Sequence, residues 1–566
     1  MIKNLGSTFL ACFALAACGG GEGNPGQCLG SAAVCSPAAG SSTAGNVSTV
    51  LPGPVGEARF AASSTYAQQC VAPRPAGSVD PYTQQVYNDK AGSLSNELQW
   101  IRSFVNETYL WYDEVPAIDL AGYTVGATVP YYKPSDNVRT LRTLARATDV
   151  TEAFFNSQRT SATTASGKPK DQFHFIYATP EWNALSQAGA SVGYGFEPAI
   201  ISTRPPRKIL VAFTSPNSQA ATNLLARGTE FLTVNGSDVV NGSDLATINE
   251  GLFAPVAGKS YTFGVRDVGS TTTRSVTMTA GTVTSTPVQN VSVLPTATGS
   301  VGYMLFNDHI ATAEAQLVDA VNQLKTANAG AGVSDLVLDI RYNGGGYVDI
   351  ASELAYMIAG STATSGKVFE GFSVNRKNPF GPNQPGSTPF LSTASGFSVA
   401  SGSPLPQLNL PRVFVLTGGG TCSASESIIN GLRGAGVQVI QIGATTCGKP
   451  YGFYPEENCG TTYFTIQFKG INNAGFGDYA DGFVPAGSGA AANNLPGCVV
   501  PDDFTKALGD PSEGRLAAAL KFRTDGTCPV VVASKRAGGV KVDAEPVLLR
   551  SPLRDNRWLG GRGARS

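Results

Sequence analysis

The chain has 566 residues, a length that suggests several domains. Hydrophobic residues make up 42% and charged residues 14%, so a large core is available and the surface must be rich in small polar residues. A net charge of −1 disfavours nucleic acid as a partner, and only two histidines, His174 and His309, disfavour histidine-rich metal sites. We expect neither a metal nor another cofactor.

The N-terminus reads MIKNLGSTFLACFALAACGG. Lys3 precedes an apolar run, residues 5–17, that is too short to be a permanent membrane span. The run ends in LAACG, which resembles the lipobox of bacterial lipoproteins. The resemblance implies that residues 1–17 are a signal peptide and that Cys18 is lipidated. The protein would then be anchored to a membrane of the cell envelope, facing the periplasm or the exterior. The alternative is an ordinary secretory signal with an incidental cysteine.

Ten cysteines are present, and Cys12 would leave with the signal peptide. Besides Cys18, eight remain: Cys28, Cys35, Cys70, Cys422, Cys447, Cys459, Cys498 and Cys528. An even number in an exported chain favours disulfides, and the lack of paired CxxC spacing argues against zinc. The sequence leaves the connectivity open.

Residues 18–92 are rich in Gly, Ser, Ala, Pro and Thr, which predicts a flexible tether. The composition and the apolar pattern change at NELQWIRSFVNETYLWYDEVP. There apolar residues recur at helical spacing, and Ser95 or Asn96 is a suitable N-cap. A second helical segment is predicted over 137–158. These features assign residues 93–186 to a small helical domain.

Short strand-like runs and an Asn-Gly turn predict a β-rich unit over 187–290, with one helix near 218–226. The order of segments resembles a PDZ domain. VGYGFE corresponds to the carboxylate-binding loop, and RGTEFLTVNGSDV to the glycine-turn-strand signature. The resemblance implies a groove that binds a chain end. The alternative is a β-rich insert without a peptide groove.

From about residue 300, apolar runs alternate with amphipathic segments, which predicts a sheet covered by helices. The predicted strands are VGYMLFN, SDLVLDIRYN, RVFVLTGGG and VQVIQIG. We therefore expect a multidomain α/β protein with a βαβ core over 295–532. Residues 533–566 are basic and glycine-rich without apolar periodicity, which predicts a disordered tail.

Two glycine-rich turns between a strand and a helix are suited to chemistry. Ser423 follows LTGGGTC and begins a helix, so the amide of Ala424 would lie at the positive helix end and could bind an oxyanion. In the other turn, NGGG, the amide of Gly345 is a second candidate donor. Asp339 and Arg341 lie at the end of the strand that precedes this turn, and they are expected to pair and support it.

A serine nucleophile needs a base. Lys449 is a candidate because its neighbours are small or aromatic, with no acid before Glu456, and burial can lower the pKa of a lysine toward neutrality. His309, after the first core strand, is the alternative base. His174 lies among aromatic residues, where packing is the expected role.

DIRYNGGG, TCSASE and TTCGKPYG, in this order, resemble the motifs of the S41 peptidases, the carboxy-terminal processing protease family. The resemblance spans roughly residues 190–510 and implies a serine peptidase with Ser423 as nucleophile and Lys449 as base. The chain departs from the family pattern in two ways. The spacing between the two residues is one longer, and Phe453 replaces the glutamine that orients the lysine in the processing branch. Glu426, Ser425 and Tyr451 are candidates for the missing partner.

Cys422 and Cys447 lie beside the two predicted catalytic residues. If the turns meet, a disulfide between these cysteines would lock them together. Pairing of Cys447 with Cys459, or of Cys459 with Cys498, is the alternative.

The sequence thus predicts a lipid-anchored serine endopeptidase that acts on peptides or on unfolded or C-terminal protein segments. The alternative is a catalytically idle peptide-binding lipoprotein on the same scaffold.

Overall fold

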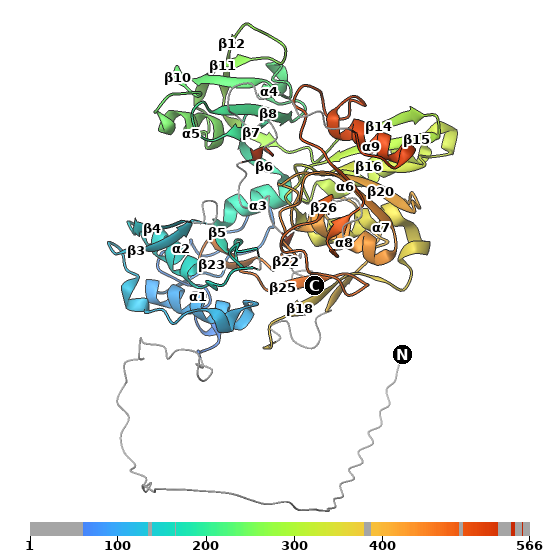
Figure 1. Ribbon diagram of the computed structural model, residues 1–566. Helices are drawn as coiled ribbons and strands as arrows, with labels where there is room; N and C mark the ends of the chain where they lie inside the picture. The colour runs from blue at the N-terminus through green and yellow to red at the C-terminus, as the bar shows by residue number, and fades with distance from the viewer. Residues whose placement is uncertain are drawn as a thin grey trace, which may run out of the picture. The chain divides into compact units, whose positions relative to one another are not determined.

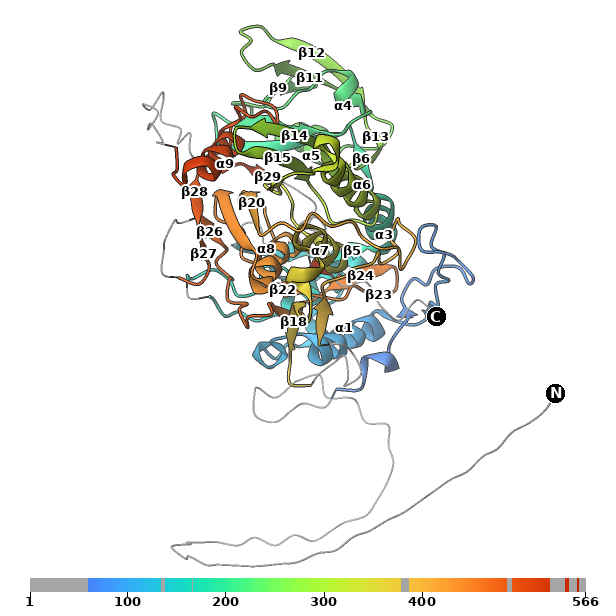
Figure 2. The ribbon, with the colours of Figure 1, turned by 90° about the vertical axis from the view of Figure 1, so that its right-hand side faces the viewer.

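The computed structural model describes residues 60–133, 138–164, 166–377, 386–485, 491–529, 545–548 and 557–558 (Figures 1 and 2). The chain divides into two compact units, residues 1–48 and 49–566, and the described residues belong to the second. In these ranges, no helix has the length and apolar character needed to cross a bilayer. The signal peptide, Cys18, Cys28 and Cys35 lie outside the described residues.

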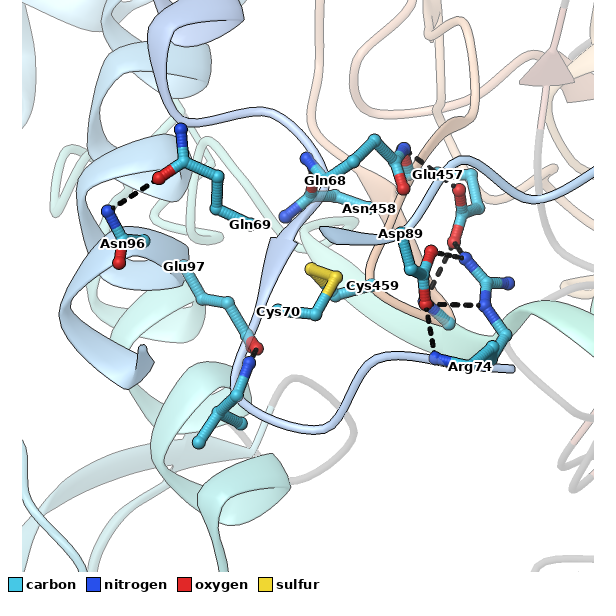
Figure 3. The surroundings of a disulfide bond; sticks show 12 residues. Gln68, Gln69, Cys70, Arg74, Asp89, Asn96, Glu97, Glu457, Asn458 and Cys459 are labelled. Atoms are coloured by element: carbon cyan, nitrogen blue, oxygen red, sulfur yellow. Dashed lines mark hydrogen bonds and ion pairs between the residues drawn. A yellow bond between two sulfur atoms is a disulfide. The ribbon is translucent and has the colours of Figure 1, made fainter. Parts of the chain in front are cut away.

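The prediction of a flexible tether over 18–92 is wrong for its described part, residues 60–92. Strands β1 (Gln69–Cys70) and β2 (Lys90–Ala91) pair in parallel. Cys70 is buried and forms a disulfide with Cys459 (Figure 3). Arg74 donates to Asp89 at 2.9 Å and also forms an ion pair with Glu457. A covalent bond and partly buried ion pairs thus order a segment whose composition indicates flexibility.

Residues 93–186 contain strands as well as the predicted helices. The elements are α1 (Leu94–Thr108), β3 (Thr128–Lys133), β4 (Val138–Thr143), α2 (Ala147–Ser157), β5 (Phe175–Ala178) and α3 (Thr179–Ala188). The helix predicted over 137–158 is half wrong, because VRTLRT pairs with β3 as an antiparallel strand. Valine and threonine favour such a strand once a partner is available. Helix α1 is capped by Ser93 rather than by Ser95 or Asn96, and the Ser93 side chain accepts from the Asn96 amide.

The β-rich unit has a hydrophobic core of its own, built around Val211, Phe231 and Phe263. Its main sheet has the order β12-β11-β9-β8-β7-β29, and β10 pairs with β9. The edge strand β29 (Val547–Leu548) comes from the C-terminal part of the chain. The bounds are β6 (Ala190–Gly193), β7 (Phe196–Ser202), β8 (Lys208–Thr214), β9 (Glu230–Val234), β10 (Ser237–Asp238), β11 (Ser260–Arg266), β12 (Arg274–Thr279) and β13 (Gly281–Thr284). Two helices occur where one was predicted, α4 (Gln219–Thr222) and α5 (Leu245–Phe253). Helix α5 was missed because LATINEGLF contains weak helix formers, and its start is stabilised by an Asp244 cap.

The α/β core predicted from the βα alternation is a six-stranded sheet of order β14-β15-β16-β20-β21-β28, parallel from β15 onward. Its strands are β14 (Val288–Thr296), β15 (Gly299–Phe306), β16 (Asp335–Asp339), β20 (Arg412–Thr417), β21 (Gln438–Gly443) and β28 (Gly497–Val499). Its helices are α6 (Ala313–Thr326), α7 (Val348–Thr364), α8 (Ala424–Ala435) and α9 (Gly514–Asp525). The predicted strands and helices of this core are confirmed, and α9 is an additional helix.

Successive side chains of β15 point to opposite faces of this sheet, as expected for a strand. Met304 and Phe306 join the cluster that contains residues of α6, α7 and α8. Tyr303 and Leu305 join a second cluster that contains residues of α9 and Ala199 of β7. Both faces are therefore buried, one of them partly by the β-rich unit.

Shorter strands complete the fold. They are β17 (Gly346–Tyr347), β18 (Val368–Val374), β19 (Ser387–Pro389), β22 (Tyr451–Gly452), β23 (Glu456–Asn458), β24 (Thr461–Phe464), β25 (Phe468–Ile471), β26 (Val484–Pro485), β27 (Asn494–Leu495), β29 (Val547–Leu548) and β30 (Arg557–Trp558). The last two belong to the predicted disordered tail, 533–566, most of which lies outside the described residues.

Candidate active site

Ser423 lies in a sharp turn between strand β20 and helix α8. It is fully buried and has φ 61° and ψ −117°, a conformation that non-glycine residues rarely adopt. The turn is fixed on both sides, because the Thr421 hydroxyl donates to Ile340 O at 2.9 Å and the Cys422 amide donates to Asn343 O at 3.1 Å. The sequence therefore places this hydroxyl-bearing residue at the N-terminus of a helix, where the dipole favours negative charge.

Lys449 follows strand β21 and is also fully buried. Its Nζ lies 4.4 Å from the ring centroid of Phe173 and 4.7 Å from that of Phe453. Phe453 stands at the position where the resembling family has a glutamine, so an aromatic wall replaces a polar partner there. The sequence alone gave no sign that Phe173, from the N-terminal part of the chain, would reach this amine.

Glu426 joins the serine turn to the lysine turn. Its Oε2 accepts from the Ser423 amide at 2.9 Å and from the Lys449 amide at 2.8 Å. Its Oε1 accepts from the Thr446 hydroxyl at 2.5 Å and from the Gly448 amide at 2.9 Å. Burial raises the pKa of the Glu426 carboxyl, and the four donors oppose this shift. The predicted supporting role of Glu426 thus has a geometric basis through the backbone of both turns.

The other two candidate partners of the lysine have contacts elsewhere. The Ser425 hydroxyl donates to Asn343 O at 3.0 Å. The Tyr451 ring packs edge-on against Trp111, with centroids 4.9 Å apart, and burial raises the pKa of its hydroxyl to about 12.

Cys422 and Cys447 form a disulfide across the two turns, with their Cα atoms 5.2 Å apart. The Cys447 amide also donates to Thr421 O at 3.0 Å. The alternative pairings are wrong, because Cys459 bonds to Cys70 and Cys498 bonds to Cys528. Cys70 lies in the predicted tether, 18–92, and its pairing with Cys459 is therefore not expected from the sequence.

The same disulfide bears on metal binding. Among the described residues, Cys422, Glu426 and Cys447 bring possible ligand atoms within 4.8 Å of one another. The disulfide removes both thiolates, so this group acts as a staple between the turns rather than as a set of metal ligands.

The glycine turn after β16 is clamped to the backbone of His309. The His309 amide donates to Gly345 O at 3.1 Å, and the Tyr347 amide donates to His309 O at 2.9 Å. Gly346 has φ 139°, and a Cβ there would lie 2.4 Å from His309 O, so only glycine fits. This close approach explains the last glycine of the NGGG motif.

The two predicted oxyanion donors differ in the structure. The Gly345 amide donates to Asn343 Oδ1 at 2.9 Å, within its own turn. The Ala424 amide, at the first position of α8, has no acceptor among the described residues. Ala424 is therefore the open donor, and Gly345 would have to exchange its bond with Asn343 to become one.

Arg341 and Asp339 pair as predicted, with Nη2 and Oδ2 2.9 Å apart. Two acids that sequence reasoning missed complete the site. Arg341 Nη1 lies 2.7 Å from Asp502 and 2.7 Å from Glu513, and the Tyr303 hydroxyl donates to Asp339 at 2.7 Å. Glu513 also caps α9. No signal in the sequence links residues more than 150 positions apart, so only the fold could reveal them.

The same ion network reaches the β-rich unit. Arg227, between α4 and β9, donates to the Tyr342 hydroxyl and to Asp502, each at 2.6 Å. The Asp502 side chain is only 2% exposed, and the guanidinium of Arg227, with those of Arg515 and Arg341, holds the pKa of its carboxyl well below the usual range against the cost of burial. The β-rich unit is thereby tied to the residues that precede the glycine turn.

Both histidines are buried and engaged away from the serine turn. His309 Nδ1 lies 3.0 Å from Asn343 Oδ1, and its Nε2 has no hydrogen-bond partner in the described ranges. Burial lowers the pKa of His309 to about 3. His174 stacks on Phe155, with centroids 3.8 Å apart, as its aromatic context predicts. The ring of His309 therefore does not bind the Ser423 hydroxyl.

Comparisons with known proteins agree with the motifs. Residues 300–452 match the model of peptidase family S41. The structure is similar to that of a protein assigned to the S41 proteases from Bacteroides fragilis NCTC 9343, with a TM-score of 0.52 and 22% identity over 76% of this chain and 97% of that chain. No curated protein matches.

Two further structures align less closely. The photosystem II D1 C-terminal processing protease has a TM-score of 0.39 and 19% identity, over 75% of this chain and 100% of that chain. Mature CPAF complexed with lactacystin has a TM-score of 0.35 and 13% identity, over 69% of this chain and 93% of that chain.

Proposed function

We propose that the protein, whose residues 300–452 match the model of peptidase family S41, is a serine endopeptidase in which Ser423 and Lys449 form a catalytic dyad. One observation supports this most strongly. The turn with Ser423 and the turn with Lys449 share the carboxylate of Glu426 and are joined by a disulfide.

In the proposed reaction, the neutral amine of Lys449 takes the proton from the Ser423 hydroxyl as that oxygen attacks a peptide carbonyl. Full burial of Lys449 supports the neutral form, since desolvation penalises an ammonium. The Ala424 amide and the N-terminus of α8 stabilise the tetrahedral oxyanion. The Lys449 ammonium returns this proton to the leaving amine as the C–N bond breaks, and water, losing its proton to the neutral lysine, then hydrolyses the acyl-enzyme.

For the β-rich unit we propose PDZ-like recruitment of a substrate chain end by strand addition. A cavity of about 650 Å³ supports this role. It is lined by Tyr194, Gly195 and Phe196 of the VGYGFE segment and by Leu252 and Phe253 of α5. These are the segments that would form the two sides of a peptide groove.

The lipobox-like segment supports a lipid anchor at Cys18 in the cell envelope, and disulfides agree with export to an oxidising compartment. Replacing Cys18 by serine is expected to move the protein from the membrane fraction to the soluble fraction. Retention in the membrane fraction would contradict the anchor.

The peptidase proposal is tested with Ser423→Ala and Lys449→Ala on an unfolded protein substrate. Each variant is expected to lose at least about 10³-fold in kcat/KM, because nucleophile and base act as a unit. Lys469→Ala is the matched control, since Lys469 lies in β25 and pairs with Asp478 at the surface. Equal cleavage by the wild type and Ser423→Ala would instead favour the peptide-binding alternative. Loss of activity in His309→Ala with only weakening in Lys449→Ala would favour a serine-histidine hydrolase.

A further inference from the structure

The C-terminal part of the chain contacts three places that surround the proposed active site. Described residues 545–548 reach the loop before Ser423 and the edge of the β-rich sheet, and described residues 557–558 reach the glycine turn. A basic, glycine-rich segment without apolar periodicity would not be expected to make such specific contacts.

The first contact is an ion pair at the loop that leads to Ser423. Arg515 is fully buried, donates to Val500 O at 3.0 Å and pairs with the carboxylate of Glu545. Glu545 also accepts from the Gly419 amide. The pair joins a fully buried guanidinium to a carboxylate of the C-terminal segment, so it is a specific anchor for the chain end.

The second contact lies at the edge of the β-rich sheet. Strand β29 pairs antiparallel with β7, with Val547 opposite Ile200 and Leu548 opposite Ala199. Strand β7 begins at Phe196 in the VGYGFE segment, which lines the groove proposed for strand addition of a substrate. The chain's own C-terminal segment therefore occupies that edge.

The third contact lies beside the glycine turn. Strand β30 pairs in parallel with β17, with Arg557 opposite Gly346 and Trp558 opposite Tyr347. Strand β30 also contacts β22, which follows Lys449 directly. An extended backbone thus lies between the strand after the glycine turn and the strand after the lysine.

We propose that residues 545–548 and 557–558 occupy the substrate-binding surface as an intramolecular competitor of substrate peptide. This rests on the proposed peptidase function, because the surface is defined by Ser423, Lys449 and the β7 edge. The competitor is held by two strand pairings and one buried ion pair. Because it is tethered, its effective concentration is on the order of millimolar, so a free peptide at micromolar concentration competes poorly.

The test uses the full chain with Ser423→Ala, so that no peptide is cleaved, and a fluorescent synthetic peptide of residues 543–560. In a second chain, Glu545→Arg and Trp558→Pro are added. The arginine repels Arg515, and proline cannot donate in a strand. The released chain is expected to bind the labelled peptide at least tenfold more tightly, measured by fluorescence anisotropy. Equal binding by both chains, or binding by neither, would overturn the proposal.

This binding test is independent of catalysis, so tight binding by the released chain stands even if the peptidase proposal fails. In chains that retain Ser423, Glu545→Arg with Trp558→Pro is expected to lower KM at least tenfold with little change in kcat. Asp525→Arg is the matched control, because Asp525 is an exposed acid at the end of α9 that pairs with Lys521. An unchanged KM in the released chain would contradict the competitor, as would an equal decrease in the control.

Discussion

Replacing Glu426 by glutamine removes one charge from the point where the turn with Ser423 meets the turn with Lys449. The carboxylate accepts four donors, two on each oxygen. An amide in the same place turns an NH₂ group toward two of them. The less costly orientation turns the NH₂ group toward Thr446 and Gly448. The Thr446 hydroxyl can rotate to accept from it, whereas the Gly448 amide is left without an acceptor.

The cost follows from these contacts. One stranded buried donor costs about 1–3 kcal/mol, and the bonds that remain lose the extra strength of a charged acceptor, roughly 1 kcal/mol each. The free energy of unfolding of Glu426→Gln should therefore fall by about 3–5 kcal/mol. Peptidase activity should fall in the residual folded protein as well, because the Ser423 and Lys449 amides are positioned by the same group.

Glu353→Gln is the matched control for this measurement. Glu353 is a second buried glutamate on a helix, and its Oε1 accepts from the Ser395 amide at 2.8 Å. Its Oε2 has no hydrogen-bond partner among the described residues. Burial, with Glu314 nearby, raises the pKa of Glu353 to about 8, so it is a neutral acid at pH 7 that glutamine imitates.

Both variants are compared with the wild type by urea unfolding at pH 7 with disulfides intact. Glu353→Gln should change the free energy of unfolding by less than about 1 kcal/mol. The reasoning is refuted if Glu426→Gln is equally mild, or if the two variants lose the same amount.

Two further predictions concern the disulfides and pH. Replacing both Cys422 and Cys447 by serine should lower the free energy of unfolding by about 3 kcal/mol and remove most of the peptidase activity. Replacing both Cys498 and Cys528 by serine should lower the free energy of unfolding by a similar amount, because the sequence separations are 25 and 30, but should change the activity little. Urea unfolding and peptide hydrolysis measure both, and equal activity in the two double variants would contradict a catalytic role for the first disulfide. Burial lowers the pKa of His309 from 6.5 to about 3. Between these pH values His309 is protonated in the unfolded state but not in the folded state, so the free energy of unfolding decreases as the pH falls below 6.5. Relative to His309→Gln, the wild type should lose about 1.4 kcal/mol per pH unit between pH 6 and 4, and a constant difference in unfolding free energy would rule this out.

The sequence predicts the strands and helices of the α/β core well because its signals are local. Strand β16, DLVLD, is buried at every position, and α8 begins directly after Ser423 where a glycine-rich turn meets an apolar period. Such elements follow from hydrophobic patterning and turn residues within about ten positions of each other. Ser423 and Lys449 could be singled out for the same reason.

The errors occur where distant contacts override local composition. Residues 60–92 read as a tether, yet Cys70 bonds to a cysteine 389 positions away. VRTLRT reads as helix, yet it pairs with β3. Asp502 lies in an unremarkable loop and becomes important only because Arg227 and Arg341 converge on it. Local composition alone does not indicate which of these distant residues will meet.

The Glu426 hydrogen bonds and the disulfide, which both join the turn with Ser423 to the turn with Lys449, act at different stages of folding. Hydrogen bonds to Glu426 can form only after the turns have met, and closing the loop between them costs chain entropy. The disulfide between Cys422 and Cys447 removes about 3 kcal/mol of that cost from the unfolded state. The carboxylate can then hold two amides in place without also having to close the loop. If this division is right, reduction of the disulfide should weaken the effect of Glu426→Gln on activity, because without the staple the turns are already displaced. Full additivity of the two changes in a double-mutant cycle would show that they act independently.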